Sequence, residues 1–382
     1  MQLPFRAAYI AFDPHPSYKG ASTHIGHFAA ALANAHGPLL LLTLKGDQEA
    51  IRTEQIHQEC FVSSSLNLLD RAMEFTKWVK NMLAQHHSIL IVHFRDVWGG
   101  MASLHFPHLR SVFEVNGVPS IELPYRYPML SPDTLIKLAA LEDYCLGQAH
   151  AVITPSHTTA KYLMGRGVPS HKLTVIPNGA ELPAQCKQPT DLPSQYFAYI
   201  GAVQPWQGIA DLLRALRYLE DTQLLLVICC SHQEHLAKSY REFAEQAGVA
   251  HRVIWRYQYS RAEVNRVLQH AQFSVAPLTE CSRNIEQGCS PLKVIESMAN
   301  GTAVIASGVP PVQEIIEHRV DGILCRPSRP TDLARNIRLA IENPVYVKTL
   351  VAAARQKVSR HFTWEKSGAT LQATYNTLFT LA

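Results

Sequence analysis

Short apolar runs alternate with longer amphipathic stretches along the whole chain. The runs predict strands and the stretches predict helices, and their alternation is typical of a parallel α/β sheet. In the first half the expected strands are residues 7–12, 39–44, 89–94, 111–115 and 151–154, and the expected helices are about 22–36, 70–86 and 133–148. In the second half the expected strands are residues 197–201, 223–230, 252–256, 273–276, 303–306 and 322–325.

A proline-containing stretch over residues 183–194 separates the two sets of strands and has the composition of a linker. The chain has 382 residues, which is too many for one core and sufficient for two domains. We therefore expect one domain at 1–182, a second at 183–362, and a terminal helix at 363–382. Thr363 is the expected N-cap of that helix, and its apolar stripe is formed by Trp364, Leu371, Tyr375 and Leu378.

The segment at 290–307 predicts a loop, a helix of about three turns, a glycine stop and a buried strand. Ser290 is the expected N-cap, and Pro291 suits the first helical position because its missing N–H is harmless there. Lys293 and Glu296 are three residues apart and share a helix face. Free amides and a lysine suit a diphosphate, and a carboxylate suits sugar hydroxyls. The alternative is an ordinary structural helix start, since Ser-Pro openings are common.

Composition excludes several classes of protein. The chain is 47% hydrophobic and 17% charged with a net charge of +4, and no basic run makes nucleic acid a leading partner. No apolar stretch reaches the ~18 residues that span a bilayer, and residues 7–12 are too short for the core of a signal peptide. We expect a soluble cytoplasmic protein. Helix residues Phe75 and Trp78 favour core packing, and peripheral membrane contact stays open.

The eight cysteines contain no Cys-x-x-Cys pair, which argues against a zinc ribbon or a redox motif. Cys229 and Cys230 end an apolar run and are expected to be inert core thiols. The set fits a reducing compartment better than a disulfide framework. The chain also contains no Asp-x-Asp motif and no metal-spaced histidine cluster.

The pattern Pro291-Leu292-Lys293-x-x-Glu296, continued by Met-Ala-x-Gly, resembles the nucleotide-sugar helix of family-4 retaining glycosyltransferases. The Val-Ile-Pro-Asn-Gly run at 175–179 and the Phe-x-Trp-Glu run at 362–365 are also similar to that family. The resemblance covers nearly the whole chain and is stronger in the second half. It implies the GT-B fold, with two Rossmann-like domains facing across a cleft and a last helix that crosses back to the first domain.

The same resemblance implies roles for the two domains. The domain at 1–182 would face the acceptor, and the domain at 183–362 would bind the nucleotide sugar. Glu296 matches the glutamate that holds the nucleotide ribose. The family's activity is sugar transfer with retention of anomeric configuration, and the nucleotide sugar serves as co-substrate with no further cofactor and no metal.

Two departures from the family pattern concern the donor's sugar and base. Family members carry two glutamates eight positions apart, and Gly288 stands where the first would be. Glu286 lies two residues earlier and would substitute only if the loop were rearranged. Tyr257 replaces the glycine after the base-binding strand, which would change how the base is held.

A third departure concerns the diphosphate. The family's arginine and lysine in this place align with Ala202 and Gln207, so both cations are absent. Lys293 is the best replacement, with Arg283 as a second. The donor-binding residues that we expect are Gly20, Tyr257, Arg283, Ser290, Pro291, Leu292, Lys293 and Glu296.

Polar residues in the first domain follow the ends of expected strands, where open α/β sheets bind ligands. Gly20 lies after the first strand, where its missing side chain would let the backbone approach a phosphate. Glu114 is the first candidate for a group close to the reacting sugar, with His93 second; the alternative is that each caps nearby backbone. The expected acceptor-side residues are His24, Arg95, Asp96 and Asn116, and the expected catalytic residues are Glu114, His93 and Lys293.

The sequence therefore predicts a glycosyltransferase that moves a sugar from a nucleotide donor to the hydroxyl of a glycan, a lipid-linked sugar or a small molecule. The main alternative is a degenerate, non-catalytic protein that binds a nucleotide sugar or a partner. It is motivated by the changes at Ala202, Gln207 and Gly288. A GT-B epimerase or phosphorylase is a third reading that no residue favours. Donor base, sugar, acceptor and oligomeric state are not readable from the chain.

Overall fold

The computed structural model describes residues 4–380, and the chain divides into two compact units. The first unit runs up to Ser17, over Ala21–Pro177 and on from Ser367, and the second contains Tyr18–Gly20 and Asn178–Lys366. The chain thus enters the second unit a few residues before the expected boundary at 182/183. It leaves that unit shortly after the expected start of the terminal helix at residue 363.

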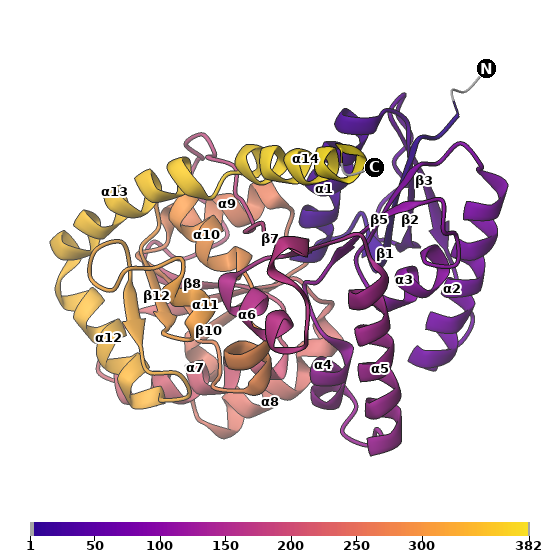
Figure 1. Ribbon diagram of the computed structural model, residues 1–382. Helices are drawn as coiled ribbons and strands as arrows, with labels where there is room; N and C mark the ends of the chain where they lie inside the picture. The colour runs from indigo at the N-terminus through magenta and orange to yellow at the C-terminus, as the bar shows by residue number, and fades with distance from the viewer. Residues whose placement is uncertain (1–3, 381–382) are drawn as a thin grey trace. The chain divides into compact units, whose positions relative to one another are not determined.

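The first unit contains a parallel seven-stranded sheet in the order β3-β2-β1-β4-β5-β6-β7 (Figure 1). Its strands are β1 Ala7–His15, β2 Leu39–Lys45, β3 Ile56–Phe61, β4 Ile91–Phe94, β5 Arg110–Glu114, β6 Ala151–Thr154 and β7 Leu173–Val175. The central strands are nearly continuous apolar runs because helices cover both faces of a parallel sheet. This order brings the carboxyl ends of β1, β4 and β5 side by side.

The helices of the first unit follow the expected helical stretches, with polar caps at several starts. They are α1 Gly20–His36, α2 Leu68–Gln85, α3 Val97–Ser103, α4 Pro119–Arg126, α5 Pro132–Gln148, α6 His157–Gly165, a 3-10 turn at Ser170–Lys172, and α14 Trp364–Thr380. The predicted cap of α5 is confirmed, since the Ser131 side chain accepts a hydrogen bond from the Thr134 N–H. Residues 1–3 and 381–382 of the predicted boundaries lie outside the described part of the chain.

Helix α14 packs on α1 within the first unit (Figure 1), where a Cβ at Gly368 would lie 3.8 Å from the Cβ of Ala31. Its start is the predicted one, because Thr363 Oγ1 accepts a hydrogen bond from Lys366 N at 3.3 Å. The predicted apolar stripe is also confirmed, since all four of its side chains are buried: Trp364, Leu371, Tyr375 and Leu378.

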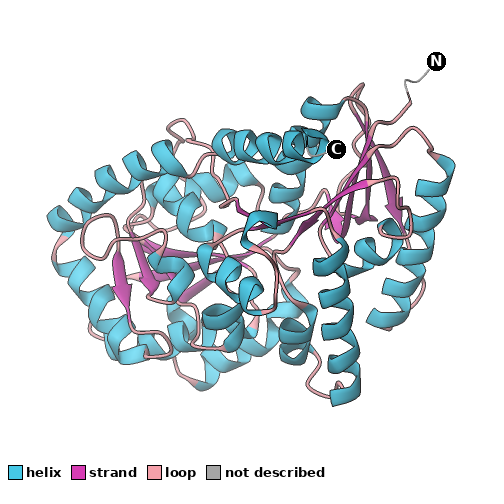
Figure 2. Cartoon of the chain, viewed as in Figure 1, coloured by secondary structure: helices cyan, strands magenta, loops and turns pink. Residues whose placement is uncertain are grey.

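The second unit contains a parallel six-stranded sheet in the order β10-β9-β8-β11-β12-β13 (Figure 2). Its strands are β8 Tyr196–Gly201, β9 Leu225–Cys230, β10 Val253–Tyr257, β11 Ser274–Ala276, β12 Val304–Ser307 and β13 Ile323–Cys325. Its α-helices are α7 Ile209–Leu216, α8 Lys238–Gln246, α9 Arg261–His270, α10 Leu292–Ala299, α11 Pro310–Gln313, α12 Pro330–Glu342 and α13 Pro344–His361. Short 3-10 turns lie at Pro205–Gln207, Arg217–Leu219, Glu234–Ala237 and Ala250–Arg252, and a π-helical turn lies at Arg283–Gln287.

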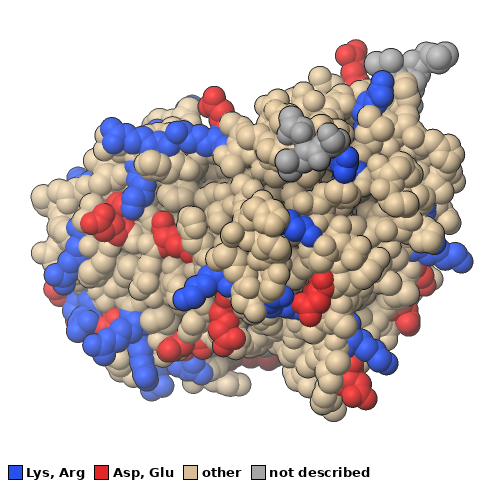
Figure 3. All heavy atoms as spheres, viewed as in Figure 1, with Lys and Arg blue, Asp and Glu red and all other residues tan. Residues whose placement is uncertain are grey.

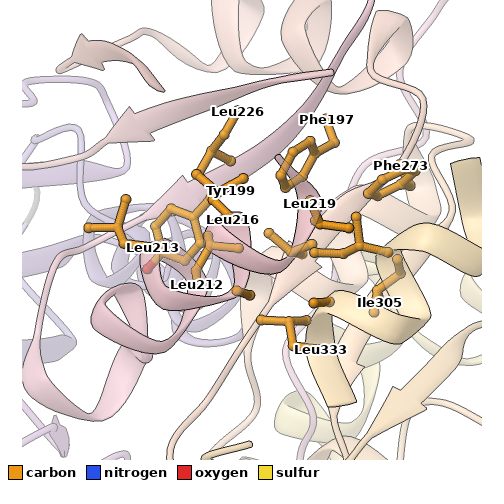
Figure 4. Close-up of a cluster of buried hydrophobic side chains, with 14 of the residues drawn as sticks. Phe197, Tyr199, Leu212, Leu213, Leu216, Leu219, Leu226, Phe273, Ile305 and Leu333 are labelled. Atoms are coloured by element: carbon orange, nitrogen blue, oxygen red, sulfur yellow. The ribbon is translucent and has the colours of Figure 1, made fainter. Parts of the chain in front are cut away.

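One apolar cluster fills the space between this sheet and α7, α8 and α12. Figure 4 shows Tyr199 of β8 among Leu212, Leu213 and Leu216 of α7. The rings of Phe197 and Phe273 stack nearby at 5.2 Å between centroids, so aromatic contacts add to the area buried (Figure 4). Tyr199 is completely buried although it carries a hydroxyl group, which therefore needs polar partners.

The fold class predicted from the sequence is confirmed, since two parallel Rossmann-like sheets are present. Strands β3 and β7 were not predicted. Three consecutive polar residues at 57–59 interrupt the apolar pattern of the edge strand Ile56–Phe61, and Leu173–Val175 has only three residues.

The predicted start of α10 is wrong. The helix has eight residues, about two turns, and its N-cap is Pro291 without a side-chain hydrogen bond. Ser290 Oγ instead accepts from the Asn178 N–H at 3.2 Å, and the Ser290 carbonyl accepts from Asn178 Nδ2 at 2.6 Å. Ser290 therefore holds the loop residue Asn178, where the chain enters the second unit, and does not cap α10.

Acidic and basic side chains are interspersed over the face shown in Figure 3, in keeping with the small net charge. None of the helices described is both long and apolar enough to cross a membrane. All eight cysteines are free thiols, and Cys229 and Cys230 are buried as predicted.

Candidate active site

The first unit holds a buried carboxylate, Glu114, at the carboxyl end of β5. Its Oε2 accepts from the Tyr9 hydroxyl at 2.7 Å and from His93 Nε2 at 2.9 Å. Its Oε1 lies 2.7 Å from His24 Nε2 and 3.0 Å from Arg95 Nε, and also accepts from the Asn116 amide. Only 2% of Glu114 is exposed, so these five donors take the place of water. We call Glu114 and its five donors the Glu114 cluster.

The Glu114 cluster holds a negative charge without solvent. Burial alone would raise the pKa of Glu114, but His24, His93 and Arg95 outweigh burial and hold that pKa well below its ordinary value. Arg95 in turn donates to Asp13 at 2.9 Å, and these carboxylates raise its pKa above the usual value despite burial. Glu114 is therefore ionised throughout the physiological pH range.

The tautomer of His93 follows from its two neighbours. Burial lowers the pKa of His93, so the ring is neutral, and its Nε2 must carry the proton that it donates to Glu114. The other nitrogen, Nδ1, then accepts from the Tyr375 hydroxyl at 2.6 Å. Helix α14 thus fixes the protonation of a residue on β4.

The structure brings five of the predicted first-domain residues together, namely His24, His93, Arg95, Glu114 and Asn116. Asp96 has a different task. Its carboxylate accepts from the Gly99 N–H at 2.8 Å, which caps α3, and from the Phe12 N–H at 2.6 Å. Burial raises the pKa of Asp96 to about 6. Gly20 is the exposed first residue of α1. The catalytic roles of Glu114 and His93 stay predictions.

The second unit holds a lysine between two neutral oxygens. Lys293 Nζ donates to the Tyr199 hydroxyl oxygen at 2.6 Å and to Gln207 Oε1 at 2.6 Å, and lies 4.0 Å from the centroid of the Tyr199 ring. We call these three residues the Lys293 cradle. Burial lowers the pKa of Lys293 to about 7. An anion placed here would meet an amine that has only neutral oxygens bound to it.

Backbone geometry leaves room for the cradle. Gly201, the last residue of β8, has φ +118°, and a Cβ there would lie 3.4 Å from Lys293 Cε and Nζ. Gly208 has φ +72°, and a Cβ there would come within 1.7 Å of the Pro277 carbonyl oxygen. Gly201 is favoured by its positive φ, and Gly208 both by its positive φ and by the close approach of the Pro277 carbonyl.

Glu296 lies one turn further along α10. Its Oε1 accepts from Arg261 NH1 at 2.7 Å, and 16% of the Glu296 side chain is exposed. Burial raises the pKa of Glu296, while Arg261 and Lys293 oppose that rise. The carboxylate therefore keeps one oxygen available beside a cation, an arrangement suited to a pair of sugar hydroxyls.

The loop before α10 carries Arg283 within a π-helical turn. Its guanidinium lies 5.2 Å from the Trp206 ring centroid. The next residue, Asn284, is fully buried and donates to the carbonyls of Trp206 at 2.9 Å and Thr279 at 2.8 Å, which fastens the loop. Glu286 is exposed on this turn.

The remaining predicted donor residues lie at other places in the second unit. Tyr257 ends β10, and its ring stacks on Trp255 with 6.3 Å between centroids and 10° between planes. Pro291 is the N-cap of α10 and Leu292 is its first residue, one position later than predicted. Among residues 4–380 no group of three or more His, Cys, Asp or Glu side chains has the arrangement of a metal site.

Sequence reasoning missed Tyr9, Tyr199, Arg261 and Tyr375. Three of them are aromatic residues inside apolar segments, where a tyrosine is indistinguishable from a core residue. The sequence did contain one signal, at Gln207. This neutral residue aligns with a lysine of the resembled family, and the loss of that lysine implied that another residue had changed with it.

The fold and the motif match known glycosyltransferases. The model of glycosyl transferases group 1 matches residues 185–357, and the model of glycosyltransferase family 4 matches residues 18–182. The chain therefore belongs to the group 1, family-4-type glycosyltransferases with the GT-B fold.

Individual relatives are distant. A glycogen synthase of Mycobacterium tuberculosis is 25% identical over 240 residues, which are 59% of this chain and 54% of that protein. Sucrose-phosphate synthase from Thermosynechococcus elongatus superimposes with a TM-score of 0.80 at 20% identity, covering 99% of this chain and 100% of that one. Anabaena HepE in complex with UDP-glucose gives a TM-score of 0.75 at 17% identity, covering 97% and 99%. The chain spans about half the length of the curated relatives it matches.

Proposed function

We propose that this protein transfers a hexose from a nucleoside diphosphate sugar to an acceptor hydroxyl, with retention of configuration and without a metal ion. The Lys293 cradle carries the proposal, because it presents a half-buried amine beside the first turn of α10 with only neutral oxygens bound to it. A diphosphate is the ligand that such a cation and free helix amides suit. The structural likeness to HepE, whose structure contains UDP-glucose, supports the same donor class.

Each donor group has a matching residue in the second unit. Lys293 and the amides of α10 bind the diphosphate, with Arg283 as the second cation. Glu296 accepts from the ribose hydroxyls and Arg261 holds that carboxylate in place. Tyr257 lies at the end of the edge strand β10, where its ring limits the space for the base.

The reaction breaks the bond between the anomeric carbon and the diphosphate oxygen and forms a bond from that carbon to the acceptor oxygen. Lys293 and helix amides stabilise the leaving diphosphate while positive charge develops on the sugar ring. The departing phosphate oxygen takes the acceptor's proton on the same face, which retains the configuration. Positioning of the two substrates supplies much of the rate.

The first experiment is thermal shift and calorimetric titration with UDP, GDP, ADP and TDP and their common sugar conjugates. Binding of one base class, followed by transfer to an acceptor in excess EDTA and an unchanged anomeric configuration in the product, supports the proposal. Absence of binding to every nucleotide overturns it and favours the non-catalytic alternative. Interconversion of the nucleotide sugar without an acceptor identifies an epimerase instead.

A second experiment tests the site. Glu296→Ala is expected to weaken nucleotide binding at least tenfold, because it removes the acceptor for the ribose hydroxyls. Lys293→Met is expected to lower turnover at least a hundredfold, a loss comparable to that of one electrostatic group at a developing charge. Unchanged kinetics in both variants would contradict this assignment of the donor site.

A further inference from the structure

Arg261 and Glu296 are joined by only one of the two parallel hydrogen bonds that a guanidinium and a carboxylate can form. Arg261 Nη1 donates to Glu296 Oε1 at 2.7 Å. The other nitrogen, Nη2, is shielded from solvent and has no hydrogen-bond partner in the described part of the chain. The other oxygen, Oε2, accepts no hydrogen bond from residues 4–380 either. The pair therefore leaves one donor and one acceptor unused.

Two further contacts fix Arg261 relative to the helix that carries Glu296. Asn265 lies one turn after Arg261 on α9, and Asn300 lies one turn after Glu296 at the end of α10. Asn300 Nδ2 donates to Asn265 Oδ1 at 3.0 Å and to the Glu296 carbonyl at 2.9 Å. These polar contacts join the two helices one turn away from the ion pair, so the guanidinium is held at the carboxylate.

The start of α9 is an unfavourable place for a cation. Arg261 is the first residue of this helix, where the helix dipole opposes a positive charge. The helix start is already stabilised by Ser260 and Glu263, which form a reciprocal capping box. The helix therefore has no need of an arginine at this position, and the residue is better explained by what its guanidinium does beside Glu296.

The unused groups have the chemistry of a partner for sugar hydroxyls. A hydroxyl both donates and accepts hydrogen bonds, and here Glu296 Oε2 is an acceptor while Arg261 Nη2 is a donor. A phosphate, which only accepts, would be repelled by the carboxylate. The Arg261 side chain is 32% exposed and that of Glu296 is 16% exposed, so a ligand can approach the pair from solvent. A ligand oxygen would also recover the free energy that a buried donor without a partner costs.

We propose that Arg261 is a donor-binding residue that recognises the ribose together with Glu296. Glu296 accepts a hydrogen bond from the ribose diol, and Arg261 Nη2 donates one to the same diol after a small turn of the exposed guanidinium. Resting on the proposed function, this inference restricts the donor to ribonucleoside diphosphate sugars. A deoxyribose would leave two charged groups without the partners that the diol gives them, which costs more than the loss of one ordinary hydrogen bond.

The first test compares ribonucleotides with deoxyribonucleotides. UDP, GDP and ADP and their 2′-deoxy and 3′-deoxy forms are titrated into the full chain by calorimetry, and the ratio of the two affinities is the ribose preference. The wild-type protein is expected to show a preference of at least about a hundredfold at one of the two hydroxyls, because two hydrogen bonds to charged groups are lost. Binding with a preference below about tenfold at both hydroxyls overturns this inference and leaves the proposed function standing. Absence of binding by every nucleotide overturns the proposed function and this inference with it.

Arg261→Lys keeps a cation beside Glu296 but removes the second nitrogen. It is expected to lower the ribose preference about tenfold. It is also expected to raise KM for the nucleotide sugar without changing kcat, because the ribose is bound equally in the ground state and the transition state. Arg266→Lys, an exposed position on the same helix, is the matched control and is expected to change neither quantity. Equal ribose preference in Arg261→Lys and the wild-type protein overturns the inference.

A second pair of variants separates binding by Arg261 from the positioning of Glu296. In Glu296→Ala the arginine has no carboxylate to hold, so the ribose preference that remains comes from the arginine's own hydrogen bond. Glu296→Ala is expected to keep a preference of about tenfold, and the double variant with Arg261→Met is expected to lose it. The double variant removes both partners and leaves no unpaired charge, so it is expected to fold. The same preference in both variants shows that Arg261 acts only through Glu296 and overturns the inference.

Discussion

Glu114 shows how much a single side chain can organise in this protein. Its carboxylate receives hydrogen bonds from β1, α1, β4 and the segment after β5 while only 2% of the residue is exposed. A charge that is taken out of water to this degree depends entirely on its partners. The same arrangement orients His93 and Arg95 for any ligand at this edge of the sheet.

Replacing Glu114 by Gln is expected to destabilise the protein by about 3 kcal/mol or more, because Arg95 then keeps only Asp13 to compensate its buried charge. Urea denaturation at pH 7 measures this change. The control is Tyr9→Phe, which removes one neutral donor and is expected to cost about 1 kcal/mol. Equal effects of the two variants would show that the charge of Glu114 is unimportant.

The pH dependence of donor affinity also belongs to the residue scale. Lys293 has a pKa of about 7 in the free protein, and a bound diphosphate raises it, so the complex holds more protons than the free protein. Affinity therefore falls as pH rises above about 7, by up to about tenfold per pH unit. Calorimetric titration of UDP or ADP between pH 7 and pH 9 measures this slope. An affinity independent of pH over this range contradicts the expectation.

At the scale of elements, α14 is part of the first unit's polar network as well as of its apolar core. Tyr375 is completely buried and donates to His93 over a separation of 282 residues. Tyr375→Phe is expected to cost about 1–3 kcal/mol, since His93 Nδ1 then remains buried without its donor. The matched control is Gln372→Ala, an exposed position on the same helix, which is expected to change stability by less than about 0.5 kcal/mol. Denaturation curves of both variants test the difference.

Two glycines of the second unit allow the cost of backbone strain to be measured separately from the cost of steric crowding. Gly208 and Gly248 both have φ +72°, but only Gly208 has a neighbour in the way of a Cβ, the Pro277 carbonyl oxygen. Gly248→Ala is expected to cost about 1–2 kcal/mol from strain alone. Gly208→Ala is expected to cost at least about 3 kcal/mol and to weaken nucleotide binding, because the turn that carries Gln207 must move. Denaturation and calorimetry distinguish the two effects, and equal stability losses would contradict the assigned crowding.

At the scale of the whole molecule, acid is expected to act on the first unit through His15. This histidine is 4% exposed, and burial lowers its pKa to about 4. His15 becomes protonated near pH 6.5 in the unfolded chain but only near pH 4 in the folded chain. The free energy of unfolding therefore decreases as pH falls through this window. The loss between pH 7 and pH 5 is expected to be about 2 kcal/mol from this group.

Hydrogen exchange followed by mass spectrometry at pH 7 and pH 5 localises the acid effect, which we expect in β1 and α1. His15→Gln is the control variant. In this variant the difference between the free energies of unfolding at pH 7 and pH 5 is expected to be smaller by about 1 kcal/mol or more. Equal pH dependence in the wild-type protein and in the variant would exclude His15 as the cause.

The architecture was predictable because parallel strands covered on both faces are nearly continuous apolar runs, and Leu39–Lys45 is an example. Edge strand β3 was missed because three consecutive polar residues, 57–59, give it no apolar run. One of them, Gln58, is nonetheless fully buried and donates to Thr43 and to the His15 carbonyl. The site was only partly predictable. The motif indicated Lys293 and Glu296. Tyr199 lies 94 residues from Lys293 in sequence, and no local sequence pattern predicts a contact over that separation.

The separation between His93 and Tyr375 has a consequence for how the chain is made. A ribosome translates β1 to β7 well before it translates Tyr375. The nascent first unit therefore emerges before His93 Nδ1 can accept its hydrogen bond from the Tyr375 hydroxyl. The second unit must be synthesised in between. The hydrogen bonds of the Glu114 cluster can therefore be completed only after the whole second unit has been synthesised.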